Sequence, residues 1–516
     1  MNPMSADVSA AAGLIMMALL AVPLLGAVLV WSLPRSDADA HGRTARLITI
    51  GLLGVTATLA VTLWFAVPSG TALVDYPWIE DFGSRFRLAA TGLSLPLIVL
   101  TAFLMLLSVI ATNVESITHG VTSYYALVLL LTAAVLGILL AADLLLFYLC
   151  WELMLIPLYF LIGIWGSGPG PRAGTTFVVY TMIGSLLMLV AVIVVSTAAG
   201  GTTYEVLRDA AGRNQLSAST QLLCFGAFAT AFLVKSALIP FHTWLPDAQS
   251  EGPPLAAVAL GIKVGAYGML VIAYPFFPLA AVDPAVRMVL ATLGVIGVLY
   301  GSLVALVQPD FRRVMSYASI AHLGFVILGI SAFTAESLQG AMLVMINAGI
   351  TTGGMFLLLG MLRQRLGDDR FDSLGGLAVR MPLFGALVVL FALANAGLPG
   401  TNGFVGEFLV MLGSFVRFPM LTLLATIGVV LAAAYLLWAV QRMLFGPTST
   451  SMPEVRDLSG REAGVMAVFV VAIIGLGVAP SPVLRRMDES ISQLINRVEL
   501  AETLGAPVGV RPEGTR

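Results

Sequence analysis

Residues 176–198 read TFVVYTMIGSLLMLVAVIVVSTA and contain no Asp, Glu, Lys or Arg. A helix needs about 20 consecutive apolar residues to cross the hydrocarbon core of a bilayer. Similar runs recur along the whole chain, which has 516 residues, 59% of them hydrophobic and only 10% charged. Soluble domains average roughly 25% charged residues. The composition therefore excludes an ordinary soluble protein and predicts a polytopic helical membrane protein.

Hydropathy predicts about fourteen spanning helices and no soluble domain. The predicted spans cover approximately residues 11–31, 47–65, 89–111, 125–142, 144–165, 176–198, 222–244, 254–274, 286–307, 314–332, 338–362, 383–415, 421–444 and 463–479. The twelfth is too long for one straight crossing, and only Asp143 separates the fourth from the fifth. Positive charge follows the first run instead of preceding it, which favours a spanning helix over a cleaved signal peptide.

Two of the predicted spans are interrupted, so the predicted fold class is all-α with two broken helices. Pro240 and Pro246 interrupt the seventh span, and a Gly-Leu-Pro-Gly sequence at 397–400 interrupts the twelfth. A break exposes backbone polar groups, which are tolerated at membrane depth only where protein or water satisfies them. Broken helices also mark ion sites in transporters built from internal repeats. A packing kink is the alternative interpretation of each break.

The arginines predict the orientation in the membrane. Loops that follow odd-numbered spans hold most of them, for example Arg43, Arg172, Arg312 and Arg456, and the opposite loops hold fewer. Because arginine-rich loops remain in the cytoplasm, both termini are predicted to lie on the non-cytoplasmic side. The predicted location is the cell (inner) membrane.

Lysine occurs only inside apolar runs. The chain has 26 Lys and Arg residues, of which only Lys235 and Lys263 are lysine. Arginine stays charged in proteins, whereas a lysine in an apolar environment can release and regain a proton near neutral pH. A charge at mid-span costs roughly 3 kcal/mol, which argues against an accidental placement. The two lysines are therefore predicted to be functional; the alternative is that they snorkel or anchor a helix pair.

Four other ionisable residues lie in predicted spans, namely Glu152, His242, His322 and Glu407. His242 follows Lys235 by seven residues, so the two would share one face of a regular helix. A single intramembrane carboxylate could be a neutral acid in a structural hydrogen bond. Together, acids, lysines and histidines with water between them form a proton relay, so the set predicts proton translocation.

The spacing of these groups predicts an internal repeat. Glu152 and His322 are 170 residues apart, and Lys235 and Glu407 are 172 apart. This pairing predicts two five-helix inverted repeats. The predicted division of the chain is three N-terminal helices in residues 1–120, a first repeat in 121–275, a second repeat in 285–445, and a last span with an amphipathic tail in 446–516.

Four sequence motifs resemble the antiporter-like subunits of respiratory complex I. They are FLVKSALIPFHTWLPDA at 232–248, QPDFRRVMSYASIAH at 308–322, WELMLIPLYF at 151–160 and GLPGTNGFVGE at 397–407. The last two look most like subunit M, and the resemblance extends over essentially all predicted spans.

The resemblance implies a role for each candidate residue. Glu152 and Lys235 look like an interacting pair, Lys263 resembles the central relay lysine, His322 resembles a further relay group, and Glu407 resembles the terminal acid. Two positions depart from the usual pattern of subunit M. Ala348 and Gln249 stand where histidines are common, which weakens one relay step after the tenth span.

The main functional interpretation is a proton-translocating, non-redox membrane subunit of an NADH:quinone oxidoreductase. The chain has no GxGxxG motif, P-loop or cysteine cluster, so NADH, FMN, iron–sulfur clusters and quinone are expected on partner subunits, with no cofactor in this chain. The expected partners are neighbouring antiporter-like subunits and the lipid bilayer, and nothing indicates nucleic acid. Two alternatives are a cation/proton antiporter subunit of Mrp type or a membrane-bound hydrogenase module, and a structural membrane scaffold without an ion path.

Overall fold

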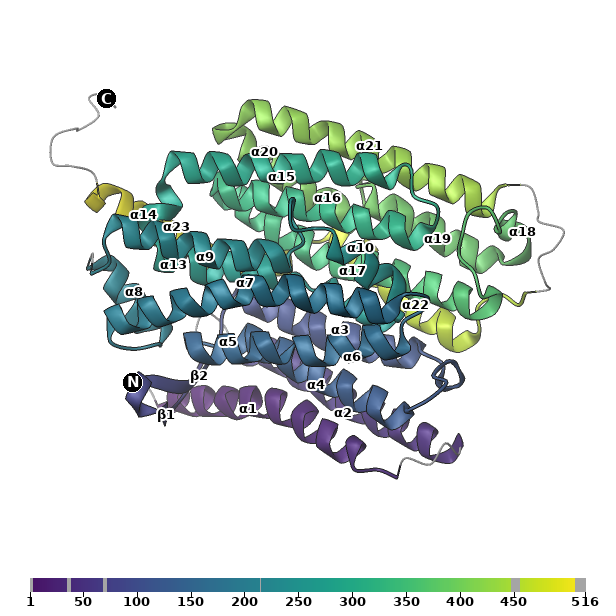
Figure 1. Cartoon of the computed structure of the whole chain (residues 1–516), viewed down its shortest axis with the longest axis horizontal. Helices are drawn as coiled ribbons and strands as arrows, with labels where there is room; N and C mark the ends of the chain where they lie inside the picture. The colour runs from purple at the N-terminus through teal and green to yellow at the C-terminus, as the bar shows by residue number, and fades with distance from the viewer. Residues whose placement is uncertain (1–2, 35–38, 68–71, 214, 447–454, 506–516) are drawn as a thin grey trace.

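The computed structural model describes residues 3–34, 39–67, 72–213, 215–446 and 455–505. Long helices lie side by side in one bundle, and their axes follow the long direction of Figure 1. In the described part of the chain, 13 stretches are long and apolar enough to cross a membrane. This confirms the predicted polytopic helical fold.

The helices follow one another with short connections. The first part of the bundle contains α1 (Pro3–Trp31), α2 (Asp39–Ala66), α3 (Ser94–Ala111), α4 (Val121–Leu140), α5 (Leu144–Leu153), α6 (Leu155–Trp165) and α7 (Gly170–Ala199), with short 3₁₀ turns η1 (Glu80–Phe82) and η2 (Val114–Ser116). The middle part contains α8 (Tyr204–Gly212), α9 (Ala218–Lys235), α10 (Trp244–Glu251), α11 (Pro254–Leu260), α12 (Val264–Gly268), the π-helix η3 (Met269–Ala273), α13 (Tyr274–Phe276) and α14 (Pro278–Val282).

The remaining helices build the second half of the bundle. They are α15 (Pro284–Ala305), α16 (Phe311–Ala332), α17 (Ala335–Leu366), α18 (Leu377–Arg380), α19 (Pro382–Asn395), α20 (Asn402–Arg417), α21 (Pro419–Leu444), α22 (Gly460–Val478) and α23 (Ser481–Gly505). The predicted twelfth span, residues 383–415, is therefore two helices, α19 and α20. The break between them accounts for an apolar run that is too long for one crossing.

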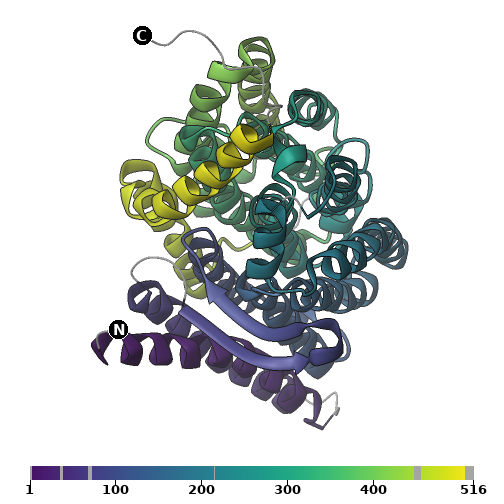
Figure 2. The ribbon, with the colours of Figure 1, turned by 90° about the vertical axis from the view of Figure 1, so that its left-hand side faces the viewer.

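A β-hairpin interrupts the otherwise helical chain, which the all-α prediction did not include. Strands β1 (Ala72–Ile79) and β2 (Ser84–Ala90) pair antiparallel. Gly83, at the turn, has a φ of 60°, a left-handed conformation that glycine adopts without steric cost. Figure 2 shows the hairpin and α23 at the same end of the bundle. We call this the hairpin end, and we call the end that carries α18 the arginine end.

Asp143 ties three segments together at the hairpin end. Its side chain caps α5 by accepting hydrogen bonds from the N–H groups of Leu145 and Leu146. The same fully buried carboxylate accepts from the Ser84 hydroxyl and from the Thr202 hydroxyl, at 3.1 and 2.6 Å, and from the N–H of Arg85. The aspartate that separates two predicted spans thus joins the hairpin, the start of α5 and the loop after α7.

The Asp143→Ala variant is expected to lose roughly 2–3 kcal/mol of stability, because the cap disappears and several buried donors lose their acceptor. Thermal unfolding of the purified protein in detergent would measure the loss. Asp143→Asn should be intermediate, since its carbonyl still caps α5 but its amide cannot accept from Arg85. An alanine variant as stable as the parent would show that the junction contributes nothing.

Arginines at the start of α16 hold the short helix α10 at the arginine end. The buried Arg312 donates to the carbonyl oxygens of Gly252 and Gln249, at 2.6 and 3.3 Å. Arg313 pairs with Glu251 at 3.2 Å. These contacts join α10, in the first predicted repeat, to α16, in the second.

Candidate functional site

The first break in a spanning helix follows Lys235. Helix α9 ends at this lysine, and an irregular segment leads to α10 at Trp244. Ala237, in the break, has a φ of 53°, which stops the helix from continuing. The side chain at the carboxyl end of a helix lies where the partial negative charge of the helix dipole favours a cation.

Lys235 is enclosed by aromatic side chains from two other helices. Its Nζ lies 4.9 Å from the ring centre of Trp151 on α5 and 5.7 Å from that of Phe177 on α7. The amine is buried and has no hydrogen-bond partner in the described part of the chain. Glu152, next to Trp151, lies close enough to interact electrostatically with Lys235. The structure therefore brings the predicted pair together without a direct ion pair.

A second break, which the sequence did not predict, lies at Lys263. Helix α11 ends at Leu260 and α12 begins at Val264, so Lys263 lies in the interruption. Its surroundings are protein, not lipid, because every residue from Leu255 to Phe276 is buried. Lys263 thus resembles Lys235 in two respects: each is a buried lysine and each lies where a helix stops.

The two lysine breaks are packed against each other through Gly265. A Cβ added to this glycine would lie 2.5 Å from the carbonyl oxygen of Phe232, and closer still to Ser236. Only a residue without a side chain allows α12 to approach the end of α9 so closely. This contact places the ends of α9 and α11, and hence both lysines, in one region of the bundle.

The third break separates α19 from α20 and precedes Glu407. Gly397 and Gly400 have φ values of 75° and 91°, in the left-handed region that favours glycine. Glu407 lies on α20 and its carboxylate turns back toward the break, where a Cβ on Gly397 would lie 3.2 Å from Oε2. The acid is buried and lies in the second turn of α20.

His322 lies close to Glu407 and within electrostatic range of Lys263. It lies on α16, and its Nε2 is 3.7 Å from Oε1 of Glu407. This distance is too long for a direct hydrogen bond, and Nε2 has no other hydrogen-bond partner among the described residues. Lys263 lies within electrostatic range of the imidazole. The buried Tyr435 also lies within electrostatic range of Glu407.

A small polar cavity of about 10 Å³ is bordered by both His322 and Glu407. It has roughly the volume that one water molecule needs. Asn347 also lines it, donates to the Asn402 carbonyl at 2.5 Å, and keeps its own Oδ1 buried without a partner. Ala348 lies in the same wall, so the position where a histidine is common borders this cavity.

His242 is placed differently from the sequence prediction. The argument that it shares a face with Lys235 is wrong, because α9 ends at Lys235 and residues 236–243 do not continue the helix. Its ring instead packs edge-on against Tyr300 of α15, with the ring centres 4.9 Å apart. The histidine is buried, and Nδ1 has no partner in the described part of the chain.

Backbone hydrogen bonds recur in two of the breaks. After Lys235 and after Asn395, three consecutive N–H groups donate in the same pattern: Ser236 to Phe232, Ala237 to Val234 and Leu238 to Leu233, and then Ala396 to Ala392, Gly397 to Ala394 and Leu398 to Leu393. By this pattern Lys235 corresponds to Asn395, whereas the spacing of 172 residues had paired Lys235 with Glu407.

Two isolated backbone bridges also recur along the chain. They join Asp143 to Thr203 and Asp310 to Arg370, and both residues of the second bridge lie 167 positions after those of the first. The pattern favours a repeat; its inversion and the domain limits stay predictions.

Asn395 and Asn347 are candidate site residues that the sequence reasoning missed. The Asn395 side-chain oxygen accepts from the hydroxyls of Thr351 and Thr352, at 3.2 and 2.9 Å, and the residue lines the polar cavity. Uncharged amides in an apolar run give a weak sequence signal. The position of Asn395 two residues before the Gly-Leu-Pro-Gly sequence is the feature that could have indicated it.

The fold and the site define a class of protein: a polytopic helical membrane protein whose bundle encloses two acids, two lysines and a histidine. A family model described as NADH:quinone oxidoreductase/Mrp antiporter, TM, matches residues 141–433. This is more than half of the chain, which therefore belongs to that family.

Several relatives match over nearly their full length. The chain is 35% identical over 490 residues to NADH-quinone oxidoreductase subunit M of Pseudomonas aeruginosa, covering 90% of this chain and 94% of the relative. It is 33% identical over 502 residues to subunit M of Escherichia coli, covering 92% and 96%. It is also 34% identical over 473 residues to F(420)H(2) dehydrogenase subunit M of Methanosarcina mazei, covering 89% and 94%.

Solved structures share the same fold. A chain of respiratory complex I from Thermus thermophilus with bound NADH matches with a TM-score of 0.85 and 30% identity, covering 94% of this chain and 99% of that one. A chain of the Mrp complex from a Dietzia species matches with a TM-score of 0.83 and 20% identity, covering 95% and 99%. The second likeness concerns the fold alone.

Proposed function

We propose that the chain is a proton-translocating subunit of a membrane-bound quinone oxidoreductase and has no redox centre of its own. The observation that carries the proposal is the juxtaposition of the two lysine breaks, which links Glu152 and Lys235 on one side to His322 and Glu407 on the other. Each group can take up and release a proton, and Lys235, Lys263 and Glu407 lie at or near a break where freed backbone groups can hold water. Glu152, Lys235, Lys263, His322 and Glu407 form the proposed relay.

Proton transfer along this row needs bridging water at its wider gaps. The gap of 3.7 Å between His322 and Glu407 borders a cavity of one-water size. A water in that cavity can donate to one group and accept from the other. Asn347 is placed to orient it through its unpartnered oxygen. We assign Asn347 a positioning role, which compensates for the absence of a histidine at 348.

The proposed orientation places the arginine end in the cytoplasm and both termini outside the cell membrane. The electron chemistry is assigned to partner subunits that hold NADH, FMN, iron–sulfur clusters and quinone, alongside neighbouring antiporter-like subunits. A subunit of an NADH-quinone oxidoreductase and a subunit of an F(420)H(2) dehydrogenase are 35% and 34% identical to this chain. The electron donor is therefore a property of the partner subunits.

A direct test is to purify the complex that contains this chain, reconstitute it in proteoliposomes and measure protons moved per electron. Electron transfer to quinone should acidify one side of the membrane, and the signal should vanish with a protonophore. An Mrp-type antiporter would instead exchange protons for sodium without electron transfer. Sodium-driven proton movement in the absence of any electron donor would favour that alternative over the proposal.

Glu407→Gln is expected to lower the number of protons moved per electron while leaving the complex assembled. Glutamine keeps the size and most hydrogen bonding of glutamate but cannot ionise, so it cannot relay a proton. The measurement is proton uptake into proteoliposomes against quinone reduction. Glu336→Gln, on the exposed first turn of α17, is the matched control and should pump normally. Full stoichiometry in Glu407→Gln would show that this acid is structural.

A further inference from the structure

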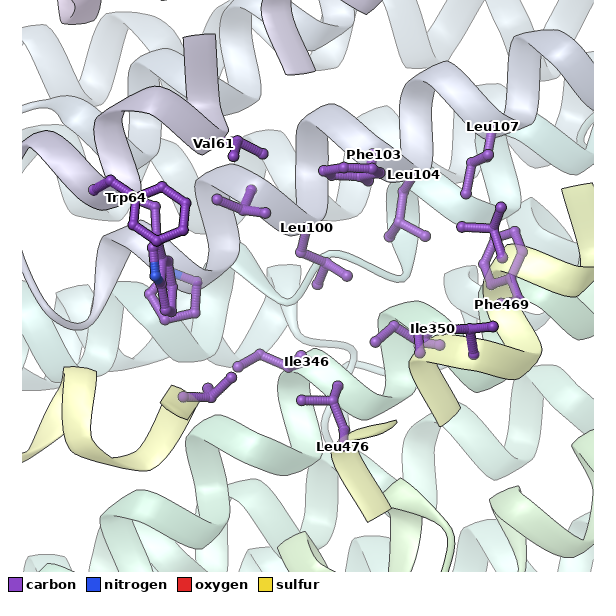
Figure 3. Close-up of a pocket in the computed structure, with 17 residues that line it drawn as sticks. Val61, Trp64, Leu100, Phe103, Leu104, Leu107, Ile346, Ile350, Phe469 and Leu476 are labelled. Atoms are coloured by element: carbon purple, nitrogen blue, oxygen red, sulfur yellow. The ribbon is translucent and has the colours of Figure 1, made fainter. Parts of the chain in front are cut away.

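A large apolar cavity lies outside the buried ionisable row. It has a volume of about 470 Å³ and lies between α2, α3, α17 and α22, with Val483 of α23 at one side. Figure 3 shows the labelled side chains of Leu100, Leu104 and Ile350 around the same space. All of the 17 lining residues are apolar or aromatic, and the Trp64 indole nitrogen is the one polar side-chain atom among them.

The cavity opens sideways at the surface of the bundle. Phe65 of α2 and Val471 of α22 line it, yet their side chains are 77% and 71% exposed. Ile346 and Ile350, on α17, form its inner wall and are buried. All four belong to membrane-spanning stretches, so the opening faces the hydrocarbon part of the bilayer.

This cavity is unlike one that holds water or stays empty. Its volume would take roughly fifteen waters, each of which needs two to four polar partners that this lining does not offer. An empty space of this size would deprive the lining atoms of dispersion contacts on one side. The medium at this depth consists of lipid acyl chains, which are flexible, apolar and narrow enough to enter from the side.

Positive charge lies at the hairpin end of the cavity. The guanidinium of Arg486, on α23, lies 5.4 Å from the ring centre of Trp64 and donates to the Trp64 carbonyl at 2.6 Å. The neighbouring Arg485 is exposed. Tryptophan is enriched where spans meet lipid headgroups, arginine can anchor a helix at that interface, and arginine pairs well with phosphate. The arginines at one end of the cavity thus suit the phosphate of a phospholipid, and the apolar lining suits its acyl chain.

We propose that this cavity binds one acyl chain of an anionic phospholipid from the leaflet at the hairpin end, with the lipid phosphate beside Arg485 and Arg486. The bound chain fills the space between α2, α3 and α22 and joins these helices to α17. This site is independent of the proposed proton relay, because none of its lining residues belongs to the row of ionisable groups.

The test uses the complete complex in nanodiscs that contain phosphatidylglycerol with a photoreactive diazirine in mid-chain. After illumination, mass spectrometry locates the labelled residues. Leu104 and Ile350 should be labelled more strongly than Leu187, a 45% exposed residue on the surface of α7. Labelling no stronger than at Leu187 would indicate ordinary surrounding lipid and overturn the proposal, and so would labelling by a photoreactive quinone tail but not by the phospholipid.

Three variants test the acyl-chain site and the charged end separately. Val99→Phe with Val468→Phe fills the cavity and should reduce labelling inside it by roughly fivefold or more, because added bulk displaces the chain. Leu187→Phe with Val190→Phe adds the same bulk to the surface of α7 and should change nothing. Arg485→Glu should abolish the preference for phosphatidylglycerol over phosphatidylcholine probes. Labelling that survives filling, or a preference that survives Arg485→Glu, would contradict the proposal.

Discussion

Lys235→Ala is expected to reduce proton transport by the assembled complex by roughly tenfold or more, because the relay loses a proton-exchanging group. The amine is buried between Trp151 and Phe177 and has Glu152 within electrostatic range. The only other lysine in the chain is Lys263, which has its own place in the proposed relay, so no spare lysine can replace Lys235. Proton uptake by proteoliposomes during quinone reduction is the measurement. Normal pumping by Lys235→Ala would refute the proposed relay.

Lys235→Arg separates proton exchange from charge. Arginine keeps the positive charge but does not release its proton, so this variant should also fail to pump. Glu152→Gln should impair pumping less, because it removes the interacting charge and leaves the amine. Arg213→Ala removes an exposed positive charge at the hairpin end and serves as the control. If Lys235→Arg pumps normally, charge alone is required at this position.

Lys263→Met is expected to interrupt transfer between the two halves of the row with a similarly large effect. Methionine has nearly the length of lysine and suits a buried apolar site, so the break at 261–263 should still pack and the protein should still insert. Proton transport should fall while assembly of the complex, followed on a native gel, stays unchanged. Transport at the parental rate would mean that protons bypass Lys263.

A second measurement separates a lost relay from a distorted fold. The contact of Gly265 with the end of α9 should keep its geometry in Lys263→Met, so thermal unfolding should shift little. A large drop in unfolding temperature together with lost transport would show a structural role for the lysine. Lost transport at unchanged stability is the result expected for a relay group.

The spanning helices could be predicted from the sequence because long uncharged apolar runs are rare outside membrane-spanning segments. Residues 176–198 lie inside α7, and 421–444 lie inside α21. The hairpin was missed although Arg85, Phe86, Arg87 and Leu88 alternate in the manner of a strand. Its two strands are short and lie between two strong helical signals, which dominate a hydropathy profile.

The breaks show how far local sequence determines the site. Proline and glycine indicated the interruptions after Lys235 and before Glu407. The interruption at Lys263 carries no proline, and it became visible only where Gly265 meets the end of α9. The ionisable residues could be picked out because they are rare in these spans, whereas the close packing of the two lysine breaks depends on tertiary structure. For His242 the assumption of a regular helix failed.

The position of α23 has a consequence for how the protein is made. Ser490 on this helix accepts a hydrogen bond from the N–H of Gly92, and Arg486 binds the carbonyl oxygens of Trp64 and Val67. The ribosome synthesises α23 after every spanning helix that the structure describes, yet α23 fastens segments made some 400 residues earlier. The contacts of Trp64, Val67 and Gly92 with α23 can therefore form only after the rest of the described bundle has been synthesised, so this part of the bundle is completed last.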